Sequence, residues 1–191
     1  NIAGLNAEAM RPFRRDVQIV FQDPYRSLNP RRTVGQSIVE GPMNFGLSEA
    51  DALERARELM RVVGLQPEAL DRFPHQFSGG QRQRICIARA LAMEPTVLIA
   101  DEAVSALDVS VQAQVLNLLK DLQSQLGLTY LFISHNLAVI DYMADRIAVM
   151  CRGRLVEVAP REVLFREPIH SYTRSLLAAV PYPDLARPLE F

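Results

Sequence analysis

Two acidic residues follow a short apolar run in the middle of the chain. Asp101 and Glu102 come directly after residues 97–100, Val-Leu-Ile-Ala, a run typical of a parallel strand covered on both faces. Open α/β sheets bind ligands at the carboxyl ends of their strands, so Asp101 is a candidate Mg²⁺ ligand beside substrate phosphates. Glu102 is a candidate base for an attacking water. An acidic helix start is the alternative, but two acids against an apolar strand favour a cationic ligand.

A pair of glycines stands just before a predicted helix. The string Ser78-Gly79-Gly80-Gln81 precedes a helix expected from Gln81 to Met93. Two glycines let another molecule approach the backbone, and a helix N-terminus attracts anions through its N–H groups and its dipole. An ordinary glycine-rich turn is the alternative, because such strings are common.

Two more polar side chains end predicted strands. His135 follows the apolar run 128–134, and neighbouring parallel strands would bring it to the same edge as Asp101, where a histidine can donate to a phosphate oxygen. Gln22 follows the run 16–21 and offers an amide oxygen to Mg²⁺ or water. Taken alone, a histidine is more often structural, and Gln22 is a weak signal. Both functional interpretations therefore depend on the place of these residues at the ends of predicted strands.

An α/β framework is needed to position these residues. Runs 96–100 and 128–134 predict buried strands, and residues 110–125 predict a helix whose apolar stripe extends to Leu126 and which stops at Gly127. Helices are also predicted at 33–45, after Ser48 as far as Gly64, and at 136–144. A strand pair is predicted at 146–151 and 155–159, followed by two short helices and a proline-containing tail. The block from about 28 to 95 is mainly helical and interrupts the alternation.

Composition narrows the class of protein. The 191 residues are 49% hydrophobic and 23% charged, with a net charge of −1, which indicates a globular domain without a basic field for nucleic acid. No apolar run approaches the ~20 residues of a membrane span. Cys86 and Cys151, the two cysteines, each lie in apolar surroundings, and we expect both to be buried, reduced thiols without a metal.

Together these motifs resemble the ATP-binding subunits of ABC transporters over nearly the whole chain. Residues 77–81, Phe-Ser-Gly-Gly-Gln, resemble the signature motif, with Phe where Leu is commoner. Residues 97–102 resemble the Walker B strand and catalytic glutamate, although Ala103 replaces the common proline. Residues 105–108, which end at Asp108, resemble the D-loop, Gln22 the Q-loop glutamine and His135 the switch histidine.

The resemblance extends to one branch of the family. Residues 21–24, 27–31 and 170–174 resemble the oligopeptide/dipeptide importers. Some members of that branch carry a cysteine cluster in the tail that binds an iron–sulfur centre. From Pro160 onward this sequence has no cysteine, so we expect no iron–sulfur cluster.

The resemblance implies an α/β fold, the P-loop NTPase core of ABC ATPases with a parallel sheet, incomplete here, and an inserted helical signature subdomain. Residues 1–27 would be part of the core ending in the Q-loop, and 28–95 the helical subdomain. Residues 96–160 would supply core with Walker B, the D-loop and the switch histidine, and 161–191 a C-terminal extension of the peptide-importer type.

The resemblance also implies partners and cofactors, ATP and Mg²⁺. A second ATPase subunit, identical or different, would close head to tail so that Ser78, Gly79, Gly80 and Gln81 contact the partner's ATP. Gln22 and Asp101 would hold Mg²⁺ in the chain's own site, Gln22 and Asp108 would be nucleotide-binding residues, and Glu102 and His135 would be catalytic. The loop after Gln22 would contact transmembrane permease subunits at the cytoplasmic face of the plasma membrane, where the subunit is peripheral. A periplasmic or extracellular solute-binding protein would act indirectly, and no nucleic acid is expected.

One family motif is missing from the 191 residues. No GxxxxGKS or GxxxxGKT occurs, and Lys120 is the only lysine. Because the first residue is Asn, we expect a fragment whose phosphate loop lies upstream, inactive alone and exposing apolar sheet surface. Two alternatives remain: a non-catalytic binding or assembly module, and a soluble ABC ATPase not involved in transport.

Overall fold

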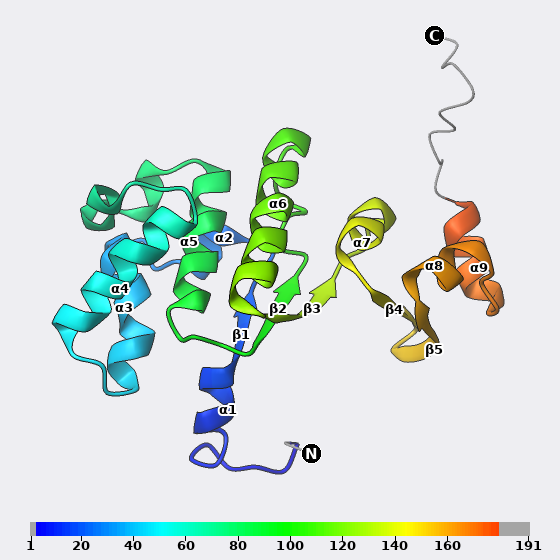
Figure 1. Cartoon of the computed structure of the whole chain (residues 1–191), viewed down its shortest axis with the longest axis horizontal. Coiled ribbons are helices and arrows are strands. Elements are labelled where there is room, and N and C mark those ends of the chain that lie inside the picture. Colours follow the sequence, from blue (N-terminus) through cyan, green and yellow to red (C-terminus); the bar gives the residue numbers. More distant parts are fainter. Residues whose placement is uncertain (1–2, 180–191) are drawn as a thin grey trace, which may run out of the picture. The chain divides into compact units, whose positions relative to one another are not determined.

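The computed structural model describes residues 3–179. Their backbone forms two compact units, one ending at Ile133 and the other beginning at Ser134, and each is described by itself (Figure 1). The described residues include no helix long and apolar enough to cross a membrane.

Three parallel strands form the sheet of the first unit. They are β1 (Val17–Val20), β2 (Val97–Asp101) and β3 (Thr129–Ile133), in the order β1-β2-β3. Ala100 pairs with Val20 on one side and with Phe132 on the other, and Asp101 pairs with Ile133. The predicted parallel sheet is therefore confirmed, as is the neighbouring position of the strands that precede Glu102 and His135.

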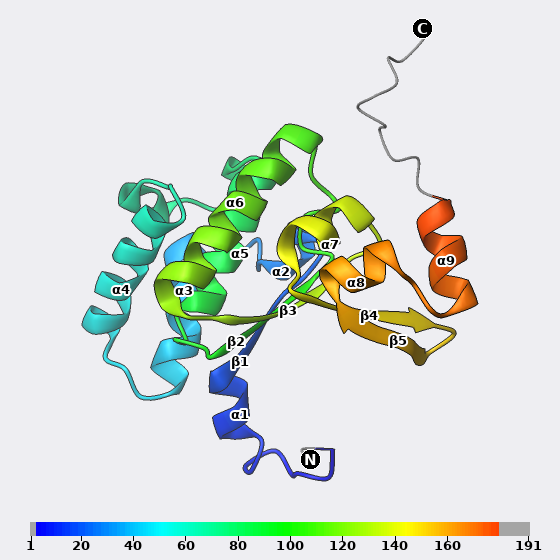
Figure 2. The same cartoon turned by 45° about the vertical axis from the view of Figure 1, so that its right-hand side comes forward.

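The two faces of this sheet differ in burial. Leu98 and Ala100 are 0% and 1% exposed, on the face beside which α5 and α6 lie side by side (Figures 1 and 2). The Tyr130 hydroxyl, on that face, donates 2.7 Å to the Leu119 carbonyl of α6. On the opposite face Leu131 and Ile133 are 53% and 45% exposed. The prediction that β3 is buried is thus wrong for this face, whereas the expected exposure of apolar sheet surface is confirmed.

The helical block between β1 and β2 has the predicted character. Its elements are α2 (Pro24–Ser27), α3 (Val34–Asn44), α4 (Glu49–Val62), the 3₁₀ helices η1 (Pro67–Asp71) and η2 (Pro74–Gln76), and α5 (Gly79–Leu91). Thr33 caps α3 through a reciprocal capping box with Gln36. Ser48 caps α4, and Gly64, at φ +73°, follows its end. These short-range signals place the helix ends within a residue or two of the prediction.

Two further helices complete the first unit. The helix α6 (Val109–Leu126) begins after Asp108 and ends at Gly127, at φ +64°. Its predicted stripe packs inward at Val115, Leu119 and Leu122, but Leu126 is 53% exposed, so the stripe stops one turn early. The helix α1 (Arg11–Asp16) was not predicted, and its basic side is exposed.

The second unit contains an antiparallel strand pair. It comprises α7 (Leu137–Met143), β4 (Arg146–Cys151), β5 (Arg154–Pro160), α8 (Arg161–Arg166) and α9 (Ser171–Ala178). Arg152 and Gly153 have φ of +50° and +75°, the sign pattern of a type I′ hairpin turn. The strand pair and both short helices are confirmed, and the predicted tail from residue 180 lies outside the described residues. Cys151 is half-buried, so its predicted burial is wrong; it is the last residue of a strand.

Candidate functional site

The glycine pair lies inside the first turn of α5. Ser78 is the N-cap: its Oγ accepts from the Gln81 N–H at 3.3 Å, and the Gln81 side-chain oxygen accepts from the Ser78 N–H at 3.0 Å. The helix therefore begins two residues before the predicted Gln81, because this capping box lets Gly79 and Gly80 take helical conformations. Ser78 and Gln81 are exposed. The Ser78 hydroxyl accepts in the box, which leaves its proton available to a ligand.

Asp101 and Glu102 stand at the carboxyl end of the middle strand. Asp101 is the last residue of β2, and the Glu102 N–H donates 2.9 Å to the Ile133 carbonyl at the end of β3. Glu102 has φ +47°, a left-handed conformation that costs a non-glycine residue of order 1 kcal/mol. Its carbonyl accepts from the Ser105 N–H and hydroxyl, each at 3.0 Å. Both carboxylates are half-buried, at the edge where open α/β sheets bind ligands.

Gln22 follows the neighbouring strand at the same edge. β1 runs parallel to β2 with Val20 opposite Ala100, so the chain leaves both strands in the same direction. Gln22 is exposed, and Asp23 then caps α2 by accepting from the Tyr25 N–H at 2.8 Å. The predicted loop after Gln22 thus contains one short helix.

The donor set at this edge suits magnesium bound with phosphates. Asp101 and Gln22 carry side-chain oxygens of the kind that Mg²⁺ binds, and Mg²⁺ typically uses one or two carboxylates and takes its other ligands from phosphates and water. No group of three or more His, Cys, Asp or Glu side chains able to hold a metal occurs among residues 3–179.

His135 belongs to the second unit. In sequence it stands two residues after the end of β3, and it is exposed. Asn136, the next residue, caps α7 by accepting from the Ala138 N–H at 3.0 Å. This cap starts the helix immediately after the histidine.

Asp108 caps α6 as Ser78 caps α5. Its Oδ1 accepts from the Val111 N–H at 3.0 Å and from the Ser110 hydroxyl at 2.9 Å. These bonds, that from the Val111 N–H above all, hold the pKa of Asp108 below its ordinary value. The carboxylate is exposed and favoured in its ionised form.

Sequence reasoning missed a contact between α5 and the loop after Gln22. Arg82 is only 8% exposed; its guanidinium carbon lies 3.8 Å from the centre of the Tyr25 ring, and its Nε donates 2.7 Å to the Pro74 carbonyl. In the sequence, the arginines of 82–89 form a short basic cluster. Arg82 is instead buried, and its guanidinium group lies over the ring of Tyr25, which is itself 63% exposed.

Two more side chains of α5 reach the same segment. Gln83 is fully buried, and its Nε2 donates 3.3 Å to the Phe21 carbonyl, while its Oε1 has no partner among the described residues. Arg89 donates to the Ser27 carbonyl. One helix thus carries the glycine pair at its start and holds residues 21–27 along its side. The spacing of Arg82 and Arg89, two helical turns apart on one face of a largely buried helix, was the available signal.

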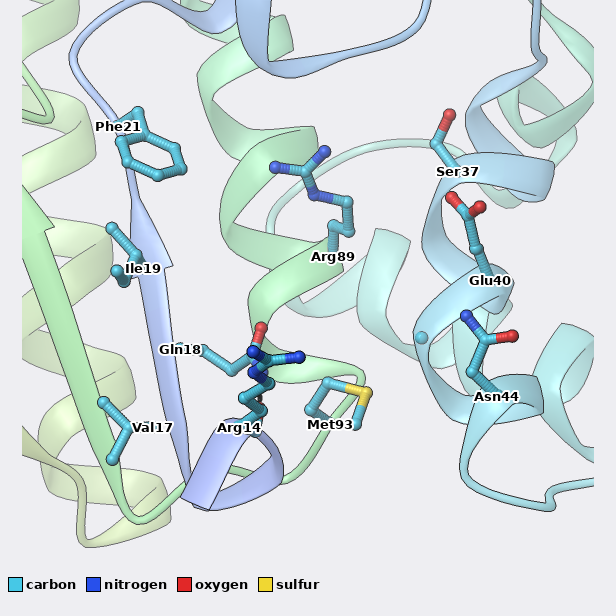
Figure 3. A pocket seen from close by; sticks show the side chains of 11 residues that line it. Arg14, Val17, Gln18, Ile19, Phe21, Ser37, Glu40, Asn44, Arg89 and Met93 are labelled. Carbon is cyan, nitrogen blue, oxygen red and sulfur yellow. Dashed lines mark hydrogen bonds between the residues drawn. The ribbon is translucent and has the colours of Figure 1, made fainter. Parts of the chain in front are cut away.

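A cavity of about 410 Å³ opens beside this contact. Side chains of α1, β1, α3 and α5 line it, and three charged groups face it: Arg14 of α1, Glu40 of α3 and Arg89 of α5 (Figure 3). Phe21, 49% exposed, lies at its wall one residue before Gln22. The cavity therefore adjoins the start of the loop expected to contact other subunits.

Comparison with known proteins assigns the class. A family model described as "ABC transporter" matches residues 2–105, more than half of the chain, and the chain belongs to this family. A solved structure, CbiO1 from Clostridium perfringens, described as part of the ABC transporter complex CbiONQ, matches with a TM-score of 0.75 at 29% identity, over 92% of this chain and 68% of that one. The predicted family and fold class are confirmed.

Curated relatives agree with the predicted branch. A probable peptide ABC transporter ATP-binding protein from Sinorhizobium fredii is 57% identical over 98% of this chain and 53% of its own length. The glutathione import ATP-binding protein GsiA from Salmonella paratyphi A is 57% identical over 97% of this chain and 30% of its own length. A putative peptide import ATP-binding protein from Brucella ovis is 55% identical over 96% of this chain and 58% of its own length. The chain thus spans between 30% and 58% of the length of these relatives.

Proposed function

We propose that this chain is part of an ATP-binding subunit that hydrolyses ATP to power an ABC importer of peptides or related small solutes. One observation carries the proposal: Asp101 is the last residue of the middle strand of a parallel sheet, and Glu102, which follows it, donates a backbone hydrogen bond to the end of the next strand. That edge is where such sheets bind ligands. Relatives named for peptide and glutathione import support the solute class.

In the chain's own site, Asp101 and Gln22 would hold Mg²⁺, which neutralises phosphate charge when it is bound. Glu102 would orient the attacking water and accept its proton. His135 would donate to a γ-phosphate oxygen and stabilise developing charge. Each role is assigned to named side chains, so each can be tested by a single neutral or isosteric substitution.

The segment 77–81 would act on a second subunit's nucleotide. Ser78 is exposed at the start of α5, so its hydroxyl and the first-turn N–H groups of Gly79 and Gly80 would donate to the partner's γ-phosphate. Gln81 would fix this turn through the capping box, and Asp108 would lie at the same subunit boundary.

The loop after Gln22, with the adjoining cavity, would contact transmembrane permease subunits at the cytoplasmic face of the membrane. The contact of α5 with residues 21–27 supports this assignment, because it joins the proposed nucleotide segment to the proposed permease segment. A solute-binding protein on the opposite side would act through the permease.

A second candidate function concerns the 191 residues alone. They contain no phosphate-loop motif, which favours a module that completes another subunit's ATP site without hydrolysing ATP itself. In that case Ser78 would matter and Glu102 would not.

The test compares the chain with a fusion that carries an ABC-family phosphate-loop segment ahead of Asn1. We expect no turnover from the chain alone, Mg²⁺-dependent hydrolysis by the fusion, and a loss of about 100-fold or more on Glu102→Gln with ATP binding kept. A folded fusion that binds no ATP would contradict the proposal. Turnover that survives Glu102→Gln would contradict the role of Glu102.

A further inference from the structure

The two glycines of the 77–81 segment have different surroundings in their own chain. A Cβ atom added at Gly79 would meet only Leu107 Cδ2, at 3.8 Å, which is ordinary van der Waals contact. A Cβ added at Gly80 would lie 2.3 Å from Val111 Cγ1, a separation that real atoms do not adopt. Gly80 is buried, whereas Gly79 is half-buried. The chain itself therefore excludes a side chain at 80 but leaves room for one at 79.

Val111 cannot easily turn away from Gly80. It is the third residue of α6, and a β-branched side chain in a helix has one strongly preferred χ1 rotamer. Its N–H donates 3.0 Å to Asp108 Oδ1, which fixes the backbone of that turn. Because α5 and α6 pack side by side (Figures 1 and 2), the Val111 methyl group occupies the space above Gly80.

The contact joins the starts of two capped helices. Ser78 caps α5 and Asp108 caps α6, and Gly80 and Val111 are each within the first three residues of their helices. A shift of α6 at Val111 would therefore move the first turn of α5, where Ser78 and Gly79 lie.

We propose that Val111 is a positioning residue that holds the first turn of α5, and with it Ser78 and Gly79, against the first turn of α6. Residue 80 must then be glycine because Val111 of the same chain leaves no room for a side chain there. This requirement is independent of any nucleotide that approaches the segment. The inference rests on the proposed function, because the contact of Ser78 and Gly79 with a partner's ATP is what gives their placement a consequence.

The first experiment measures the thermal unfolding of the chain and needs no nucleotide. Gly80→Ala should lower Tm by about 4–8 °C, because overpacking strains the core. In the double variant with Val111→Ala, the new methyl would face the Cβ of residue 111 at 3.6 Å, so Tm should return close to that of the Val111→Ala single variant. Gly79→Ala is the matched control and should not lower Tm.

The proposal is overturned if Gly80→Ala is as stable as Gly79→Ala, or if Gly80→Ala lowers Tm as much in the Val111→Ala background as in the unsubstituted chain. Should Gly80→Ala fail to fold, the double variant still decides, since restored cooperative unfolding supports the contact and continued failure refutes it.

The second experiment separates positioning from general stability. It uses mixed dimers of the phosphate-loop fusion in which one subunit carries Glu102→Gln, so that one site turns over. Val111→Ala on the Glu102→Gln subunit, which offers its 77–81 segment to the active site, should lower turnover by about tenfold. The same substitution on the active subunit should have a much smaller effect.

If Val111→Ala lowers turnover equally on either subunit, Val111 contributes only to packing and the positioning role is overturned. If the unsubstituted dimer shows no turnover, the proposed function fails, and the thermal experiment alone then decides whether Val111 dictates glycine at 80.

Discussion

The backbone N–H of Glu102 donates a 2.9 Å hydrogen bond to the carbonyl oxygen of Ile133. This bond continues the pairing of β2 with β3 one residue beyond Asp101. It goes together with a left-handed backbone at Glu102, at φ +47°, in a turn whose carbonyl receives two donors from Ser105. The proposed catalytic carboxylate is thus carried by a strained residue that its neighbours hold in place.

The strain at Glu102 predicts an unusual order of stabilities. The free energy of unfolding of Glu102→Gly should exceed that of Glu102→Ala by about 1 kcal/mol, because glycine adopts a positive φ without steric cost. Both variants lack the carboxylate, so their difference isolates the backbone. Equal stabilities in urea titrations would show that residue 102 is not strained.

Two substitutions at Ser78 distinguish its role in folding from its proposed role in binding phosphate. Ser78→Ala should lower the free energy of unfolding by about 1 kcal/mol, because the N-cap is lost. Ser78→Asp should keep the cap and nearly all of the stability, yet place a negative charge where the partner's phosphate would bind.

In the phosphate-loop fusion, Ser78→Asp should therefore abolish ATP-dependent association while its thermal unfolding stays close to that of the unsubstituted protein. Light scattering with and without ATP measures the association. Normal association of the Asp variant would contradict a phosphate contact at residue 78.

Ionisation of Asp108 should make the free energy of unfolding depend on pH. Its pKa is lowered by hydrogen bonds from the Val111 N–H and, next, the Ser110 hydroxyl. The contribution of Asp108 to stability is therefore present above the unfolded-state pKa of about 3.9 and is lost as the pH falls through the lower folded-state pKa. Asp108→Asn keeps an N-cap without the charge. The stability advantage of the unsubstituted chain over Asp108→Asn should therefore shrink between about pH 6 and pH 3; an advantage independent of pH would refute this origin.

A charged side chain at position 83 should destabilise the fold. It is fully buried, and its Oε1 is unpaired among the described residues. Gln83→Glu should lower the free energy of unfolding at neutral pH by about 3 kcal/mol or more, and the loss should shrink at acid pH as the carboxyl group is protonated. Gln83→Leu, similar in size, should cost less, because removal of the unpaired oxygen offsets the lost bond to Phe21. Urea unfolding at two pH values tests both.

The two cysteines should differ in reactivity. Cys86 is 1% exposed, and burial raises its pKa to about 11, so roughly one thiol in a thousand is ionised at about pH 8. Cys151 is half-buried at the end of β4. We expect one thiol per native chain to react quickly with a disulfide reagent and the second only after denaturation. Rapid labelling of a Cys151→Ser chain would contradict this assignment.

The sequence by itself determined the features whose cause is local. Helix ends at Thr33, Ser48 and Gly127 follow from caps and from glycine's access to positive φ, and the apolar run before Asp101 was recognisable as a strand. The motifs and their order were sufficient to identify the family, because each motif is a short contiguous string.

Only the tertiary structure decided which residues meet across the chain. The Gly80–Val111 contact, the burial of Arg82 and Gln83 and the half-exposed β3 all depend on how segments far apart in sequence pack. Likewise, the left-handed Glu102 accompanies a bond to Ile133, 31 residues away, on another strand. No local propensity encodes such pairings, because the space open to one side chain is set by atoms of another element.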